Sequence, residues 1–103
     1  MNDYKRIQSD FSFLSLYGYK FAYIGKSYIY PQVVFSNGST KIIIGMNYVD
    51  GKIFIEYYYD TKSSRSKGLL DDVEFNSRKY ENQLEKAKEI LKKFLIKLEL
   101  KDT

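Results

Sequence analysis

The chain has 103 residues, of which 44% are hydrophobic and 29% charged, and its 17 Lys and Arg against 13 Asp and Glu give a formal net charge of +4. This size and composition predict a single domain over residues 1–103 with one hydrophobic core. The chain has no Cys and no His, which excludes disulfides, thiolate metal sites and histidine general bases, so we expect no enzyme, no metal site and no cofactor.

The first residues carry no recognisable targeting signal. Residues 1–12 lack the apolar run of a signal peptide, and no segment of the sequence approaches the ~20 apolar residues that a membrane helix needs. We therefore expect a cytoplasmic protein that does not act at a membrane.

Apolar residues near the start recur at helical spacing. Tyr4, Ile7, Phe11 and Leu14 are three or four residues apart, which predicts a helix over about 3–17. Gly18 follows as the expected left-handed residue after the helix, although the apolar residues at 11–16 also fit an early strand or an irregular turn. Residues 19–24 then predict a first strand.

Two glycine-containing dipeptides predict tight hairpins. Asn37-Gly38 and Asp50-Gly51 supply the positive φ angles that a two-residue type I′ turn needs. If they are the loop residues, Ile42 pairs with Val33 on one side and with Tyr59 on the other. The same pairing gives one apolar face, whose expected core residues are Ile29, Val33, Ile42, Ile44, Met46, Tyr48, Ile53, Ile55, Tyr57 and Tyr59.

The remaining segments differ sharply in composition. Pro31 has no N–H, so we expect its strand to be bulged or unpaired at that position. Residues 61–68 offer Ser, Lys and Arg without an apolar anchor, which predicts a mobile loop. Residues 77–100 carry an apolar stripe at spacings of three and four, which predicts a long helix with Tyr80, Leu84, Ala87, Leu91, Phe94 and Leu98 facing the sheet.

Together these elements predict an α+β fold: an N-terminal helix, a four-stranded antiparallel meander and a long C-terminal helix packed on one sheet face, in two layers and in the order αββββα. The one acidic cluster, Asp71, Asp72 and Glu74, lacks the pattern of a calcium loop. We interpret it as negative charge in the first turn of a helix rather than as a metal site.

The sheet face opposite the core is the best candidate for function. In the predicted register it mixes aromatic rings with single polar groups, and Gly45 lies in a shallow dip between Tyr30 and Glu56. If no helix covers this face, it is an exposed surface typical of protein binding; the alternative is that the first helix covers it and makes a third layer. The predicted partner-binding residues, with two cations from the loop, are Tyr28, Tyr30, Gln32, Lys41, Ile43, Asn47, Phe54, Glu56, Tyr58, Arg65 and Lys67.

Two classes of binding protein fit these features. Aromatic rings on a sheet with nearby lysines are typical of RNA or single-stranded nucleic-acid binding. Residues 17–23 (YGYKFAY) faintly resemble an RNA-binding strand, but the predicted order is closer to that of double-stranded-RNA-binding domains. The second class is a non-catalytic inhibitor that binds another protein.

Four segments carry a resemblance to a family of the second class: residues 17–21 (YGYKF), 33–35 (VVF), 42–45 (IIIG) and 47–51 (NYVDG). With these segments the chain resembles the small bacterial immunity proteins encoded beside polymorphic or contact-dependent toxins. The resemblance implies a cytoplasmic protein that neutralises a toxin domain by covering its active site. Because the chain is basic, it also implies a partner whose contact surface is neutral or acidic. A phage-encoded inhibitor of a host defence protein fits the same features.

Overall fold

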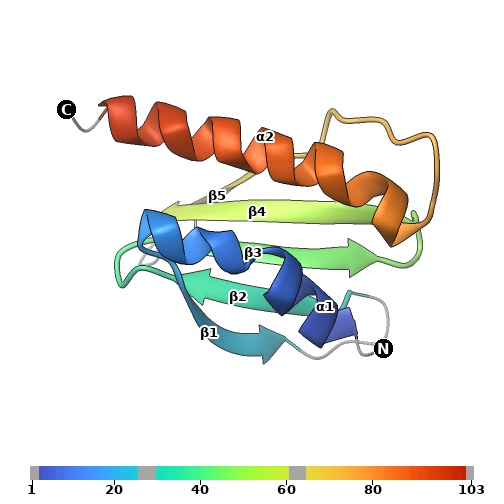
Figure 1. Ribbon diagram of the computed structural model, residues 1–103, viewed down its shortest axis with the longest axis horizontal. Coiled ribbons are helices and arrows are strands. Elements are labelled where there is room, and N and C mark those ends of the chain that lie inside the picture. Colours follow the sequence, from blue (N-terminus) through green and yellow to red (C-terminus); the bar gives the residue numbers. More distant parts are fainter. Residues whose placement is uncertain (1–2, 26–29, 61–64, 102–103) are drawn as a thin grey trace.

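The computed structural model describes residues 3–25, 30–60 and 65–101 and has an α+β fold (Figure 1). An α-helix and a 3-10 helix precede five strands and a long C-terminal helix. The strands form one antiparallel sheet in the order β1-β2-β3-β4-β5. The elements are α1 (Asp3–Asp10), η1 (Ser12–Tyr17), β1 (Lys20–Gly25), β2 (Gln32–Ser36), β3 (Lys41–Asn47), β4 (Lys52–Asp60), β5 (Arg65–Gly68) and α2 (Tyr80–Lys101).

The fifth strand corrects the prediction of a four-stranded meander and, at residues 65–68, that of a mobile loop; residues 61–64 lie outside the described residues. β5 pairs with β4, with Lys67 opposite Tyr57 and Ser66 opposite Tyr58. An edge strand is held by backbone hydrogen bonds on one side, so it can form without apolar side chains. The absence of apolar residues in this segment therefore does not exclude a strand.

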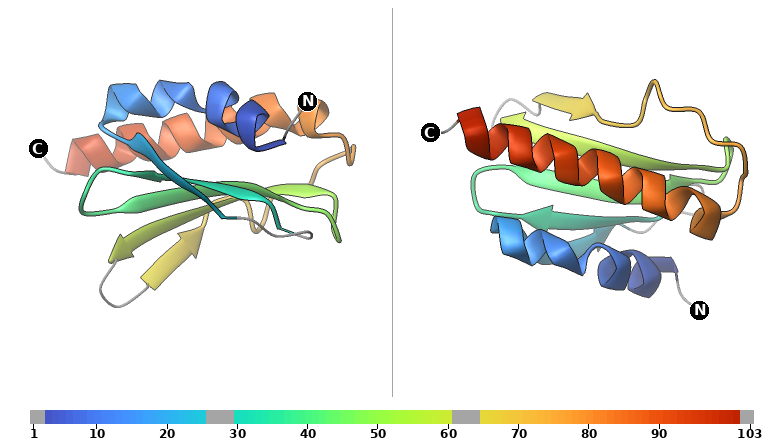
Figure 2. Two further views of the ribbon diagram at one scale, coloured as in Figure 1. Left: turned by 90° about the horizontal axis from the view of Figure 1, so that it is seen from below. Right: turned by 45° about the horizontal axis from the view of Figure 1, so that its top comes forward.

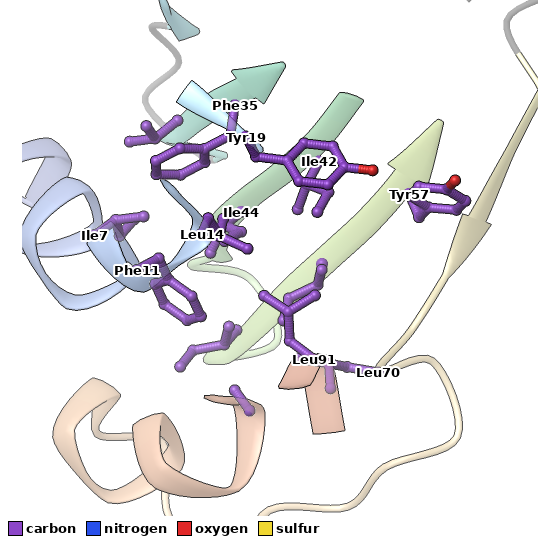
Figure 3. Packing of buried hydrophobic residues seen from close by; sticks show 14 of the residues in the cluster. Ile7, Phe11, Leu14, Tyr19, Phe35, Ile42, Ile44, Tyr57, Leu70 and Leu91 are labelled. Carbon is purple, nitrogen blue, oxygen red and sulfur yellow. The ribbon is translucent and has the colours of Figure 1, made fainter. Parts of the chain in front are cut away.

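Both helical segments lie on the same side of the sheet (Figure 2). Side chains from α1 and η1 meet those of β3, and α2 packs beside them in one continuous core (Figure 3). The three-layer alternative, with the first helix on the opposite face, is therefore wrong. None of the helices in the described part of the chain is long and apolar enough to cross a membrane.

A polar cluster joins the two helices on this side. The Tyr80 hydroxyl donates to Asp10 at 2.9 Å, and the Arg6 guanidinium lies 4.3 Å from the centre of the Tyr80 ring. Arg6 also pairs with Glu81 at 3.2 Å. Burial, with the Asp10 carboxylate beside it, raises the pKa of Tyr80 well above its ordinary 10.0, so this hydroxyl stays protonated and keeps its bond to Asp10.

The pairing within the hairpins differs from the prediction by two residues. Ile42 lies opposite Phe35 rather than Val33 on one side, and opposite Tyr57 rather than Tyr59 on the other. A shift of two residues keeps every side chain on its expected face, because strand side chains alternate with a period of two. The assignment of the apolar face therefore survives the error in the register.

The two asparagines that begin the turns account for this shift. The Asn37 side-chain carbonyl accepts the N–H groups of Ser39 and Thr40 at 2.9 and 2.7 Å. Asn47 accepts those of Val49 and Asp50 in the same way, at 2.9 and 3.2 Å. Each asparagine thus closes its turn from the strand end, as Asx turns do; the first turn centres one residue later than predicted, and the second centres one residue earlier.

Seven of the ten expected core residues of the sheet are buried. Tyr48 and Tyr59 were predicted there wrongly: they are 46% and 49% exposed. Tyr48 lies in the second turn. β3 begins at Lys41, which pairs with Tyr58, so Tyr59 has no partner residue in β3. Ile29 lies outside the described residues. The confirmed core residues are Val33, Ile42, Ile44, Met46, Ile53, Ile55 and Tyr57.

The N-terminal helix is shorter than predicted. It breaks at Phe11, which has φ −106° and ψ 18°, and the chain continues as η1. Serines at 9, 12 and 15 are poor helix-interior residues because their hydroxyls compete for backbone groups. Gly18 adopts the expected left-handed conformation, with φ 87°, and ends η1.

The C-terminal helix begins at Tyr80, three residues later than predicted, so the acidic residues at 71, 72 and 74 do not lie in its first turn. Its buried stripe includes Gln83, which the apolar pattern did not predict. Gln83 is fully buried; its side chain accepts the Ile53 N–H at 2.7 Å and donates to the carbonyls of Gly51 and Ser77 at 2.6 and 2.8 Å. This amide thus joins the start of α2 to the β3-β4 turn.

Candidate functional site

The side of the sheet away from the helices, which we call the open face, is the candidate site. In the part of the chain that the structure describes, neither helical segment packs on it (Figure 2). Alternation along the paired strands assigns its members. They are Lys20, Tyr23, Gly25, Gln32, Val34, Ser36, Lys41, Ile43, Gly45, Asn47, Lys52, Phe54, Glu56, Tyr58, Ser66 and Gly68.

Most of the predicted binding residues meet on this face. All seven that belong to β2, β3 and β4 lie there half-buried: Gln32, Lys41, Ile43, Asn47, Phe54, Glu56 and Tyr58. Tyr30 is 45% exposed and precedes β2. Tyr28 lies outside the described residues.

The two predicted cations from the loop lie elsewhere. Arg65 and Lys67 belong to the exposed edge strand β5. Lys67 pairs with Tyr57, so its side chain lies on the helix side of the sheet, with Nζ 6.0 Å from the centre of the Phe94 ring. The open face and the charged edge are therefore two different surfaces.

The dip predicted at Gly45 is closed. Gly45 lies between Gln32 and Phe54, not between Tyr30 and Glu56, because of the two-residue shift in pairing. Its buried α-carbon lies under the Phe54 ring: a Cβ at this position would be 2.7 Å from Phe54 Cζ, and it would also meet the Pro31 carbonyl oxygen. Glycine is needed here for the close approach of ring and backbone rather than for a pocket.

Pro31 contributes to the sheet through its carbonyl. Its oxygen accepts the Met46 N–H at 3.1 Å, and β2 begins one residue later at Gln32. Pro31 thus accepts a hydrogen bond from β3 just before β2 begins. Its missing N–H removes no hydrogen bond from the interior of the sheet.

An apolar centre crosses the open face. Val34 is fully buried although no helix covers it, and its partners on either side are Tyr23 and Ile43. Tyr23 is 50% exposed and was not among the predicted binding residues. The alternation of β1 could have placed it here, had the pairing of that strand with β2 been recognised. The centre is thus apolar and aromatic, with longer polar side chains around it.

Charge is unevenly distributed over the open face. Toward β1, Lys41 Nζ lies 5.6 Å from the centre of the Tyr23 ring. Toward β5, Glu56 is paired with Gly68, and the Asp71 carboxylate packs against the Gly68 α-carbon. The face is therefore basic toward β1, and toward β5 it has an acidic flank, Glu56 and Asp71, together with Lys52, whose Nζ lies 3.4 Å from the Asp71 carbonyl oxygen.

Burial raises the pKa of Glu56 above its ordinary 4.5, and the negative charge of Asp71 acts in the same direction. A hydrogen bond from Ser66 opposes them by stabilising the ionised form. The acidic flank thus carries a carboxylate that is partly desolvated and held in place by β5.

The open face resembles protein-binding surfaces in composition. Half-buried aromatic and aliphatic groups surrounded by polar side chains are typical of protein-binding surfaces. Within residues 3–25, 30–60 and 65–101, no group of three or more acidic side chains is placed to hold a metal ion.

Comparisons with known proteins give no relative. No protein-family model matches the chain, and searches of curated proteins and of solved structures found no significant similarity. Its function must therefore be inferred from its own residues.

Proposed function

We propose that this chain is a non-catalytic protein-binding inhibitor whose partner covers the open face. The observation that supports the proposal best is the placement of both helical segments on one side of the sheet, which leaves the other side without a helix in the described part of the chain. Tyrosine and phenylalanine on a rigid sheet bury much area on binding at little cost in rotamer freedom. The proposal includes a cytoplasmic protein and, following the resemblance to immunity proteins, a toxin domain as partner.

The charge distribution favours a protein over a nucleic acid as the partner. The open face carries Lys20, Lys41 and Lys52 together with Glu56, and Asp71 lies beside Glu56, so both signs of charge are present. A polyanion needs a continuous cationic path, whereas a folded protein can present complementary charges of both signs. We therefore infer that the face recognises a surface of mixed charge.

Two neighbouring tyrosines provide a matched test. Tyr58 lies on the open face, and Tyr59 lies on the helix side, with its ring centre 6.3 Å from that of Tyr57. We expect Tyr58→Ala to weaken binding to the natural partner by about 2 kcal/mol, roughly thirtyfold in Kd, with little change in stability. Tyr59→Ala should bind as the wild type does. Tyr30→Ala, at the rim, should also weaken binding.

The partner can be found by affinity capture from the native cell with the wild type and both variants, then purified for titration calorimetry. A protein retained by the wild type and by Tyr59→Ala, but lost with Tyr58→Ala, is the expected result. If that protein is an enzyme, stoichiometric addition of the chain should abolish its activity. Equal capture by Tyr58→Ala would remove the open face as the site. Tight binding to RNA at about 50 mM salt, steeply weakened by more salt, would favour the nucleic-acid class instead.

A further inference from the structure

A second surface lies on the helix side of the sheet, between the edge strand β5 and α2. A groove of about 460 Å³ runs there, within the range of roughly 300–1,000 Å³ typical of ligand-binding clefts. Its α2 wall carries Ile90, Phe94 and Leu98 at helical spacing, with Lys93 and Lys97 between them. The groove is separate from the open face and is not part of the function proposed above.

The groove carries more positive than negative charge. Of its described lining residues, Lys67, Lys93 and Lys97 are basic, and Asp72 is acidic. Lys93 also pairs with Glu89 at 2.9 Å across an exposed turn of α2. Since exposed pairs of this kind exchange readily with other carboxylates, the groove favours an anionic partner with apolar groups.

The edge of β5 offers backbone hydrogen bonds beside this groove. The Leu69 N–H donates to the Ile55 carbonyl at 2.8 Å, and bonded pairs alternate along an antiparallel ladder. The backbone groups of Lys67 and Leu69 therefore point toward β4, and those of Ser66 and Gly68 point outward. In the described part of the chain no strand lies beyond β5, so this edge can accept an added strand.

We infer that β5 and the adjoining groove bind an extended acidic segment of another protein as a sixth strand. Alternate side chains of an added strand are roughly 6.8 Å apart, and residues four apart on a helix are about 6 Å apart. Carboxylates at alternate positions of the segment therefore match Lys93 and Lys97, and Lys67 lies on the same side. A nucleic-acid backbone fits less well, because its phosphates can use the outward N–H groups but not the outward carbonyls.

The probe for this inference is a fluorescently labelled synthetic peptide of alternating Glu and Leu, titrated with the full chain at low salt and followed by anisotropy. The double variant Lys67→Glu with Lys97→Glu should bind the peptide at least about tenfold more weakly. Lys5→Glu, an exposed lysine on α1, makes the same kind of charge change away from the groove and should bind nearly as the wild type does. Added salt should weaken binding to the wild type.

A separate variant tests the backbone hydrogen bonds between β5 and the added strand. Ser66→Pro removes an outward N–H without removing a bond to β4, and proline is tolerated on edge strands in this orientation. It should abolish binding of the peptide, with a far-UV spectrum and urea midpoint like those of the wild type. If Ser66→Pro does not fold, the amide resonances of Ser66 and Gly68 in the wild type should shift on peptide addition.

Three results would overturn the inference. They are the absence of peptide binding at low salt, equal binding to a peptide of alternating Lys and Leu, and unchanged amide resonances at Ser66 and Gly68 in the saturated complex. A concentration-dependent dimer that Ser66→Pro abolishes would assign this edge to a second copy of the chain instead. Lys67 and Lys97 lie away from the open face, so their variants let the two proposals fail separately, whereas Ser66→Pro also removes the hydroxyl that bonds Glu56 on that face.

Discussion

The two faces of the sheet are made by the same strands and differ in what their side chains do. On the helix side, the residues of β2, β3 and β4 from Val33 to Tyr57 are at most 8% exposed. On the open face, their immediate neighbours, apart from the buried Val34 and Gly45, are half-buried and mix aromatic, aliphatic and charged groups. The buried core is thus built mainly from one set of alternate residues, and the other set is partly accessible to solvent.

Neighbouring isoleucines of β3 give the sharpest test of this difference. Ile44 is fully buried under the helices, whereas Ile43 is half-buried on the open face. Ile44→Ala should lower the free energy of unfolding by about 3 kcal/mol, since it removes buried methyl groups and leaves a cavity. Ile43→Ala should cost about 1 kcal/mol. Urea unfolding measures both, and equal losses would show that the open face is packed as tightly as the core.

Two glutamines extend the comparison to polar groups. Gln83→Leu should cost about 2 kcal/mol, because the Ile53 N–H and the Gly51 carbonyl lose their buried partner. Gln32→Leu, the same change on the open face, should alter stability by no more than about 0.5 kcal/mol. A Gln83→Leu protein with the wild-type urea midpoint would mean that water replaces the amide and that the buried polar link is dispensable.

Two glycines show where the open face itself resists change. Gly45→Ala should destabilise the protein by about 2 kcal/mol, because the new Cβ meets the Pro31 carbonyl and the Phe54 ring. Gly25→Ala places its Cβ 2.7 Å from Gln32 Cγ, but that side chain is flexible and can move. We expect it to be nearly neutral in thermal unfolding. A neutral Gly45→Ala would show that Phe54 can leave its position over the strand.

The smallest expected effect concerns the acidic flank. The pKa of Glu56 is raised by burial, so the folded protein binds this proton more tightly than the unfolded chain does. The wild type should therefore lose stability relative to Glu56→Gln as pH rises through the folded pKa, and the two should converge below the ordinary value of 4.5. Ser66→Ala removes the hydrogen bond that opposes the shift and should steepen this dependence. Urea midpoints measured across acidic pH check both predictions. They are contradicted if the wild type becomes more stable relative to Glu56→Gln as pH rises.

The sequence predicts the faces of the sheet better than its pairing. Alternation and apolar spacing are properties of single segments, and they place Val33, Ile42 and Ile55 correctly in the core. The pairing depends on how each turn closes. Asn37 and Asn47 can provide either a positive φ angle or a side-chain acceptor, and the sequence alone does not decide between these roles.

Two other features escaped prediction because they are stabilised by polar and backbone hydrogen bonds, which leave no apolar pattern in the sequence. β5 has no apolar residue to indicate a strand and is stabilised by β4 through backbone bonds. Gln83 interrupts an apolar stripe, and its buried amide is hydrogen-bonded by the Gly51 carbonyl and the Ile53 N–H, about thirty residues earlier. The composition of the open face was predicted. That Phe54 closes the dip at Gly45 could not be predicted, because it depends on the observed pairing of β3 with β4.

The pleat of β3 and β4 has a consequence for how such a chain diversifies. Ile43 and Ile44, or Tyr57 and Tyr58, are encoded side by side yet belong to different layers. Substitutions at every second codon can alter the open face while the scaffold beneath is inherited unchanged. Gly45, which lies under the Phe54 ring, is an exception, and a lineage in which this surface changes should keep it while its neighbours drift.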